Sequence, residues 1–140
     1  MSTILVAAAI IVERGRVLLT QRKRGAHLEG MWEFPGGKVE DGEDPKAALA
    51  RELREEIGVD VDVGDIVEVT FHAYETKSVL LLFYGATRRA GSPEPRALDV
   101  AAFDWADPRA LDPAKFPPAD VAVLRKVKAL VTKSESGRTH

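Results

Sequence analysis

The chain has 140 residues, of which 45% are hydrophobic and 30% charged, with 11 glycines, 8 prolines and no cysteine. This composition is that of a globular protein and excludes a disordered chain, a coiled coil and a collagen-like repeat, while the lack of cysteine excludes a disulfide scaffold, a thiolate zinc site and a cysteine nucleophile. A formal net charge of −2 argues against binding to a nucleic acid polymer by phosphate neutralisation, and favours a small-molecule partner.

Two apolar runs near the start of the chain are predicted to be strands. Leu5–Val12 and Arg16–Gln21 are separated by Glu13-Arg14-Gly15, a typical hairpin sequence. The longest apolar stretch covers only residues 4–12, whereas a membrane-spanning helix needs about 20 residues. Because no positively charged leader precedes this stretch, we expect a cytoplasmic location and no membrane partner.

Residues 22–42 are rich in glycine and charge, with Phe34-Pro35-Gly36-Gly37 at their centre, and we expect a long functional loop. A helix of about 13 residues is predicted to follow. Asp44 is a typical N-cap, Pro45 suits the first helical position and Gly58 is a typical C-terminal stop.

The second half of the chain is predicted to hold strands at Val59–Val69, Ser78–Ala86 and Ala102–Trp105, and a helical turn from Asp107-Pro108. After Phe116-Pro117-Pro118 we predict a last helix with one apolar face, formed by Val121, Leu124, Val127 and Val131. The polar residues 133–140 are expected to fray, which leaves a single domain over residues 1–132. This order of elements predicts an α/β fold, with a mixed β-sheet packed between helices.

The middle helix carries the main chemical signal. Glu52, Glu55 and Glu56 are spaced i, i+3 and i+4, so they share a helix face on which like charges repel by roughly a few tenths of a kcal/mol per pair. They also lie near the helix C-terminus, where the dipole disfavours anions. A divalent cation would relieve both effects, and hard oxygen ligands suit Mg²⁺. Taken alone, the pattern is more often a solvated face with an Arg51–Glu55 pair.

The three glutamates belong to a longer pattern of fixed spacing. It runs over residues 37–59 as Gly37-x5-Glu43-x7-Arg51-Glu52-Leu53-x-Glu55-Glu56-x-Gly58-Val59, and it resembles the Nudix box without departure at any fixed position. A chance match over so many positions is negligible. Trp32–Glu40 and Phe116–Asp120 extend the resemblance to MutT-type Nudix hydrolases as far as about Val131. The resemblance implies an α/β/α sandwich and Mg²⁺-dependent hydrolysis of a nucleoside diphosphate linked to another group.

The resemblance further implies a metal site and catalytic roles. The cofactor would be Mg²⁺, with Mn²⁺ as the alternative, and Glu52 would orient or deprotonate the attacking water, with Glu55 and Arg51 in the same catalytic group. Arg51 would hold a glutamate in place. The metal ligands would be a carbonyl oxygen from the loop of Gly36 and Gly37, the carboxylates of Glu52, Glu55 and Glu56, and Asp99, six residues before Trp105, where MutT-type enzymes usually have Glu. The alternative for Asp99 is a solvated loop residue.

For the nucleotide, the resemblance points to residues outside the box. Arg22 suits phosphate because of its bidentate guanidinium, and Tyr74 is a candidate for stacking on a base, or else a half-buried aromatic residue of a strand. Asp120 stands where the best-known MutT enzymes have Asn, which leaves the base preference open. The full substrate-binding set is Arg22, His27, Glu33, Phe34, Tyr74 and Asp120.

The function predicted from the resemblance is conversion of a nucleoside triphosphate to the monophosphate and pyrophosphate, foremost the removal of oxidised purine nucleotides such as 8-oxo-dGTP. The alternatives are a CTP or dCTP pyrophosphohydrolase, a hydrolase of dinucleoside polyphosphates or ADP-sugars, and a nucleotide-binding module without catalysis. The intact acidic set argues against the last of these. We expect a monomer or a homodimer.

Overall fold

The computed structural model describes residues 2–138, with side chains as far as residue 131. It contains eight strands, two α-helices and two short 3-10 helices within those residues. In chain order they are β1 (Thr3–Ile10), β2 (Val12–Glu13), β3 (Arg16–Gln21), β4 (Trp32–Glu33), β5 (Gly36–Lys38), α1 (Pro45–Ile57), β6 (Val61–Ala73), β7 (Ser78–Arg88), β8 (Ala102–Ala106), η1 (Pro108–Ala110), η2 (Pro113–Lys115) and α2 (Pro118–Arg138).

The strands form two sheets of four. The first has the order β5-β1-β7-β6, and in the second β3 pairs with β2, β4 and β8. The β1–β7 pair is parallel, with Thr3 opposite Ser78 and Ile10 opposite Gly85, whereas every other pair is antiparallel. The expected mixed sheet is therefore present, but it is divided into two.

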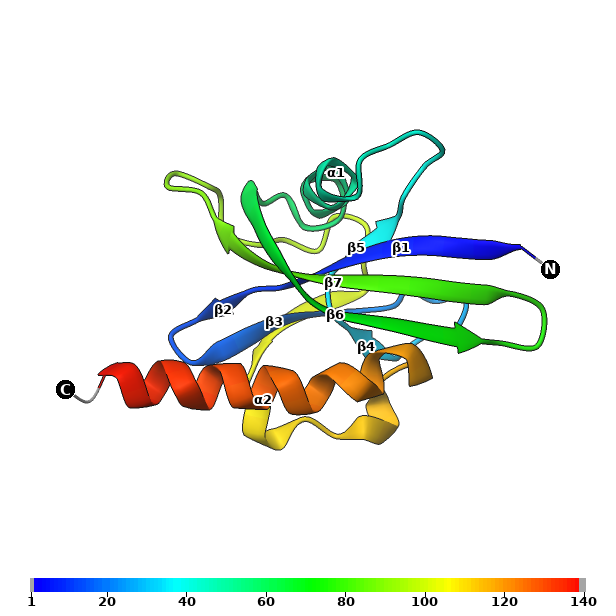
Figure 1. Ribbon diagram of the computed structural model, residues 1–140. Coiled ribbons are helices and arrows are strands. Elements are labelled where there is room, and N and C mark those ends of the chain that lie inside the picture. Colours follow the sequence, from blue (N-terminus) through cyan, green and yellow to red (C-terminus); the bar gives the residue numbers. More distant parts are fainter. Residues whose placement is uncertain (1, 139–140) are drawn as a thin grey trace.

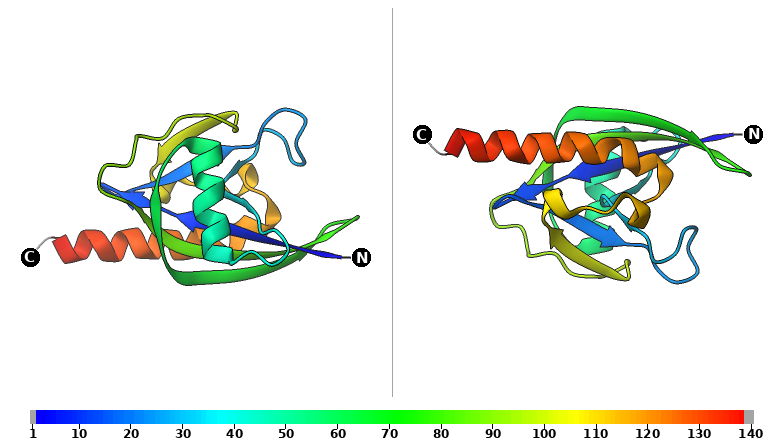
Figure 2. Two further views of the ribbon diagram at one scale, coloured as in Figure 1. Left: turned by 90° about the horizontal axis from the view of Figure 1, so that it is seen from above. Right: turned by 90° about the horizontal axis from the view of Figure 1, so that it is seen from below.

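The two helices cover opposite faces of the sheets (Figure 1; Figure 2). Side chains alternate across each strand, so Ala7 and Ala9 of β1 pack with Leu49, Leu53 and Ile57 of α1. The intervening residues of β1 face the other way, toward a second core on the α2 side that includes Ala8, Ile10, Phe83, Val123 and Val127. This arrangement confirms the predicted α/β/α sandwich.

Helix α1 begins and ends where its capping residues predict. The Asp44 carboxylate accepts a hydrogen bond from the Ala47 N–H, and Pro45 occupies the first helical position. At the other end Gly58 has φ +70°, the left-handed conformation that ends many helices, and its N–H donates to the Arg54 carbonyl. The caps fix the rotation of the acidic face relative to the core.

The strand boundaries near the N-terminus differ from the expectation. The predicted strand Leu5–Val12 is interrupted at Ile11, because the chain leaves the β7 partner there and its next residues pair with β3. Arg14 and Gly15 both have positive φ, as a two-residue hairpin turn requires. The expected loop over residues 22–42 contains the short strands β4 and β5, which bring its centre onto both sheets.

The last helix is longer than predicted, and its buried face is rotated. Val121 is 39% exposed, so its assignment to the apolar face was wrong, whereas Val123 is fully buried together with Leu124, Val127 and Val131. The backbone is helical as far as Arg138. The fraying expected for residues 133–140 involves side chains beyond residue 131 and the last two residues of the chain, all of which lie outside the described part of the structure. Among the described residues, no helix has both the length and the apolar character needed to cross a membrane.

Candidate active site

Two adjoining cavities lie beside the N-terminal halves of β1 and β7. The large cavity, of about 370 Å³, is lined by Phe34, Gly36, Gly37, Glu52 and Glu56 among others. The small cavity, of about 130 Å³, is lined by His27, Tyr74, Pro117 and Ala119 among others. Both share an apolar floor and four polar side chains, and the shared residues are Ile4, Val6, Leu81, Arg22, Glu33, Lys77 and Asp120.

The two glycines of β5 allow close approach on two sides of the strand. A Cβ atom on Gly36 would overlap the β1 backbone at Ala7 and Ala8, the second of which is its partner in the β1–β5 ladder. A Cβ atom on Gly37 would overlap the carboxyl group of Glu52 on α1. Glycine at position 37 therefore lets the carboxylate of Glu52 lie directly against the backbone of β5.

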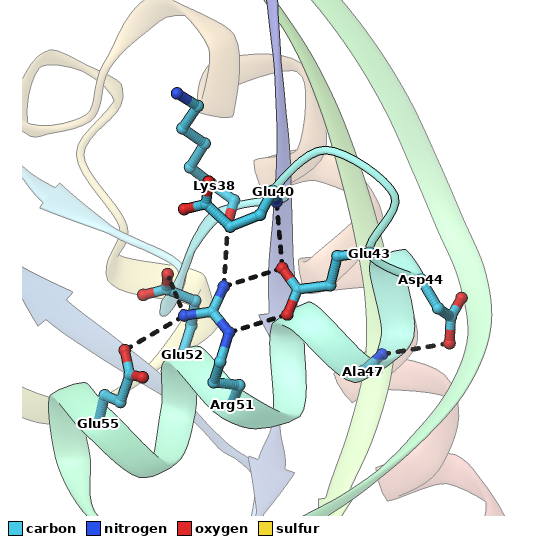
Figure 3. Close-up of polar contacts among 8 residues, drawn as sticks. All are labelled: Lys38, Glu40, Glu43, Asp44, Ala47, Arg51, Glu52 and Glu55. Carbon is cyan, nitrogen blue, oxygen red and sulfur yellow. Dashed lines mark hydrogen bonds and ion pairs between the residues drawn. The ribbon is translucent and has the colours of Figure 1, made fainter.

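Arg51 lies at the centre of a group of glutamates (Figure 3). Its guanidinium donates to both carboxylate oxygens of Glu43, at 2.8 and 3.0 Å, and to Glu52 and Glu55, at 3.1 and 3.2 Å. It also donates to the Lys38 carbonyl at 3.4 Å. The ion pair with Arg51 lowers the pKa of Glu43 to about 2. One cation thus fixes two glutamates of α1 relative to the loop that precedes the helix.

Several carboxyl groups lie in and beside the large cavity. Burial, and then the neighbouring carboxylates of Glu52, Glu33 and Asp99, raise the pKa of Glu56 to about 8. Burial likewise raises the pKa of Glu52, which the Arg51 cation partly offsets. Two carboxyl groups that repel each other in a partly desolvated cavity are characteristic of a site that takes a cation.

Of the three glutamates predicted on one face, only Glu52 and Glu56 line the large cavity. The Glu55 side chain is 57% exposed and pairs with Arg51. Within the described part of the chain, no three His, Asp or Glu side chains are grouped closely enough to hold a metal ion. The cavity nevertheless offers an all-oxygen donor set next to the β5 backbone, and this donor chemistry fits a hard divalent cation.

Asp99 lies at the edge of this acidic group and does not line either cavity. The N–H groups of Leu98 and Asp99 each donate to the Glu56 carbonyl at 3.0 Å, which ties the loop to the end of α1. The Asp99 carboxylate is exposed and pairs with Lys23. The structure therefore places Asp99 beside the end of α1 and pairs it with Lys23, which was not predicted from the sequence.

The polar side of the small cavity contains two carboxyl groups and one arginine. Arg22 donates to Glu33 at 2.9 Å and to the His27 carbonyl. Asp120 is only 4% exposed, and burial raises its pKa well above the usual value, with Glu33 adding to the effect and the Phe34 N–H opposing it. Burial also raises the pKa of Glu33. Burial therefore favours the protonated form of Asp120.

The Tyr74 ring is already in contact with two histidines. Its centroid lies 5.1 Å from that of His27 and 4.5 Å from that of His72, both in edge contacts. Burial raises the pKa of Tyr74, and the backbone of Ala119 at the start of α2 opposes this shift. Tyr74 lines the small cavity, between the loop of His27 and the strand of His72.

Lys77 lines both cavities, and sequence reasoning missed it. It lies at the end of the β6–β7 hairpin, where the Tyr74 N–H donates to its carbonyl at 2.7 Å. Its proximity to the site depends on the parallel pairing of β1 with β7, which no local sequence pattern predicts. Of the described residues predicted to bind substrate, all six line at least one of the two cavities.

Comparison with known proteins identifies the family. A model of the NUDIX domain matches residues 2–127. The chain belongs to the NUDIX domain family. Over 110 residues this Nudix protein is 40% identical to an 8-oxo-dGTP diphosphatase of Haemophilus influenzae, a match that covers 70% of this chain and 81% of the relative. It is 51% identical over 67 residues to a CTP pyrophosphohydrolase of Escherichia coli, which covers 48% of this chain and 50% of the relative.

The fold gives the same assignment. A crystal structure of a MutT NUDIX hydrolase from Burkholderia pseudomallei superimposes with a TM-score of 0.81 at 28% identity, covering 91% of this chain and 99% of that one. This Nudix hydrolase is therefore an enzyme that acts on phosphoanhydride bonds. Nudix hydrolases act on small nucleotide substrates and generally use divalent metal ions.

Proposed function

We propose that this Nudix hydrolase splits a nucleoside triphosphate into the monophosphate and pyrophosphate, with an oxidised purine nucleotide such as 8-oxo-dGTP as its main substrate. The observation that carries the proposal is the junction of the two cavities. The acidic large cavity suits a cation and phosphates, and the small cavity adjoining it carries Glu33 and Asp120, two half-buried or buried carboxyl groups suited to a base edge. Arg22 and Lys77 line both.

In this proposal the metal is Mg²⁺, or Mn²⁺ in its place. Its ligands are a carbonyl oxygen of the Gly36-Gly37 strand and the carboxylates of Glu52, Glu55, Glu56 and Asp99. When bound, the ion neutralises phosphate charge and lowers the pKa of coordinated water. Glu55 has to turn from the outer side of α1 toward the cavity to join this set, and the flexible end of an exposed side chain allows it.

The chain's own groups supply the remaining chemistry. Glu52 lies against β5 with its carboxylate held by Arg51 at 3.1 Å, which suits it to orient or deprotonate the attacking water. Glu55 shares the same arginine. Arg22 and Lys77 bring positive charge to the phosphates, Arg22 through its bidentate fork. Phe34 and Tyr74 border the nucleotide with apolar surface.

Asp120 is proposed to recognise the base. A carboxyl group that keeps its proton has one donor and one acceptor, as the amide of Asn does. This resolves the departure from the Asn of other MutT-type enzymes, since a neutral Asp120 can accept from the N7–H of 8-oxoguanine and donate to O6. Unmodified guanine presents two acceptors on that edge, so one of the two hydrogen bonds is lost, at a cost of roughly 1–3 kcal/mol.

A second candidate substrate is CTP or dCTP. It is favoured by the similarity to the Escherichia coli CTP pyrophosphohydrolase and by the same neutral carboxyl group, because cytosine presents a 4-amino donor next to the N3 acceptor. The two candidates differ in the size of the base, so the volume of the small cavity, about 130 Å³, bears on the choice between them.

A substrate panel tests the proposal. Initial rates with 8-oxo-dGTP, dGTP, dCTP, CTP, dATP, ADP-ribose and a dinucleoside tetraphosphate are measured with Mg²⁺, with Mn²⁺ and with EDTA, and the products are separated by ion exchange. We expect metal-dependent release of pyrophosphate and a monophosphate, fastest from 8-oxo-dGTP. Inorganic phosphate as the first product, or turnover confined to ADP-ribose or the dinucleoside substrate, contradicts the proposed reaction. A preference for dCTP or CTP supports the second candidate.

A further inference from the structure

The first turn of α2 is tied to β6 through the carbonyl group of Ala119. The Thr70 hydroxyl donates to this carbonyl at 2.8 Å. Thr70 lies near the C-terminal end of β6. One side chain of β6 therefore holds the peptide group that joins Ala119 to Asp120.

This turn has few backbone donors of its own. Pro117 and Pro118 have no N–H, so Ala119 provides the first N–H of the helix and has no partner within the helix for it. The Asp120 N–H donates to the Pro117 carbonyl at 2.9 Å, which shapes the turn without attaching it to the sheet. Packing of Phe116 and Ala119 in the core holds the turn against the sheet, and the hydrogen bond from Thr70 attaches its backbone to β6.

Asp120 follows Ala119 directly and lines both cavities. Asp120 is only 4% exposed, so a small shift of the turn changes how deep its carboxyl group lies in the small cavity. The tie at the Ala119 carbonyl acts on the peptide group next to it. The ion pair of Lys126 with Glu68, at 3.0 Å, ties the same helix to the same strand further along.

We propose that Thr70 is a positioning residue for base recognition, because its hydrogen bond to Ala119 fixes the position of the Asp120 carboxyl group in the small cavity. The inference rests on the proposed function, in which Asp120 recognises the base. Hydrogen bonds to a base are sensitive to sub-ångström displacement, so a loosened turn weakens the discrimination between bases more than it weakens catalysis at the phosphates.

The test compares the base discrimination of matched variants, taken as the ratio of kcat/KM for the best and the worst of 8-oxo-dGTP, dGTP, dCTP and dATP. Thr70→Val keeps the shape of the side chain and removes the hydroxyl. We expect it to lower the ratio about fivefold, as loss of about one hydrogen bond gives, mainly through KM of the best substrate with kcat changed less than twofold. Thr70→Ser restores the hydroxyl and is expected to restore the ratio.

Lys126→Met is the control for general loosening of α2, since it removes the other tie to β6 and lies outside both cavities. It is expected to change Tm little, as the loss of an exposed ion pair does, and to leave the ratio unchanged. An unchanged ratio in folded Thr70→Val overturns the positioning role, as does an equal fall in Lys126→Met. Asp120→Asn and Asp120→Ala, measured in parallel, separate this failure from that of the proposed function. If they too leave the ratio unchanged, Asp120 does not recognise the base.

Discussion

Glu56 has the most unfavourable electrostatic environment of the acidic residues on α1. It lies in the large cavity with Glu52, close to Glu33 and Asp99, and its pKa is raised to about 8, first by burial and then by these carboxylates. Without a cation, Glu56 is therefore largely protonated at neutral pH. Binding of a divalent cation would expel this proton, so metal affinity is expected to rise with pH.

Replacing Glu56 by Gln removes one oxygen ligand of the proposed metal site and also removes the buried carboxyl group. We expect Glu56→Gln to reduce turnover by at least about 100-fold, while Tm in EDTA at pH 8 stays level or rises. Glu55→Gln is the matched variant. It is expected to reduce turnover as well but to change Tm little, because exposed ion pairs such as Arg51–Glu55 contribute about 0–1 kcal/mol. Near-normal turnover in both variants contradicts the metal assignment, and a large fall of Tm in EDTA favours a purely structural role.

Asp120 gives a pH prediction of its own. Its pKa is raised by burial and by Glu33, so the proton that the base hydrogen bond requires is present at low pH and is lost as pH rises through the raised pKa. The proton serves the hydrogen bond to O6, which guanine and 8-oxoguanine share, so we expect kcat/KM for both 8-oxo-dGTP and dGTP to fall with rising pH in the wild type. The preference for 8-oxo-dGTP is expected to persist, because the ionised carboxylate still accepts from N7–H. In Asp120→Asn this fall is expected to be absent, because the amide keeps donor and acceptor at every pH.

Asp120→Ala is expected to lower kcat/KM for the preferred nucleotide by roughly 5- to 150-fold, equivalent to about 1–3 kcal/mol, and to change the rank order of substrates with little effect on Tm. An equal fall on every substrate that follows a loss of Tm would return Asp120 to a role at the helix start, where the dipole favours a carboxylate.

At the scale of elements, β5 and α1 are in close contact at Gly37 and Glu52. We expect Gly37→Ala to reduce kcat more than tenfold and to lower Tm, since the added methyl group overlaps the Glu52 carboxyl group and pushes either the side chain or the helix away from β5. Gly42→Ala is the control. Gly42 has φ +74° and open space around it, so alanine there introduces only backbone strain of about 1 kcal/mol. A normal kcat in Gly37→Ala would show that Glu52 does not need this position.

The elements whose ends are marked by local chemistry were predictable from the sequence. Helix α1 has Asp44, Pro45 and Gly58 at its ends, and its bounds agree with the prediction. The strands β4 and β5 were missed because they are two and three residues long and lie among glycines and charged residues, where no periodicity can develop. The position of Lys77 in the site depends on strand pairing far along the chain, and so does the division into two sheets.

The buried face of α2 was misjudged for a related reason. An apolar residue every three or four positions fits several rotations of a helix, and Val121 was chosen over Val123, which packs between the helix and the sheet. The acidic residues of α1 show the complementary limit. Their spacing placed Glu52, Glu55 and Glu56 on one face, but the Glu55 side chain pairs with Arg51 and does not line the cavity.

For the whole molecule, several acidic groups share the direction of their pKa shift. The pKa values of Glu33, Glu52, Glu56 and Asp120 are all raised, chiefly by burial. A carboxyl group whose folded pKa exceeds its unfolded pKa binds more protons in the folded state, so its contribution to stability is present below the unfolded pKa and is lost as pH rises through the folded pKa. For Glu56 this window runs from about 4.5 to about 8.

We therefore expect the free energy of unfolding in EDTA to fall between pH 5 and pH 8.5, by up to about 1.4 kcal/mol per pH unit for each group involved. Tm is expected to fall with it. Thermal denaturation over this range measures it, with Glu56→Gln as the control that flattens the slope. Added Mg²⁺ should raise Tm most at the upper end. The carboxylates of lowered pKa, such as Glu43 at about 2, act only in more acidic solution. A Tm that rises steadily to pH 8.5 in EDTA would contradict this account.

The parallel pairing of β1 with β7 has a consequence for the order in which the molecule can be completed. Thr3 lies opposite Ser78, so β1, one of the two central strands of its sheet, pairs with a strand that is synthesised 75 residues later. At about 5–20 residues per second, that interval lasts roughly 4–15 s. During it the nascent chain supplies β1 with the short β5 edge and with α1 on one face, whereas the β7 edge and the face that α2 covers stay open. Although β1 precedes the other described strands in the chain, it is thus among the last to be enclosed.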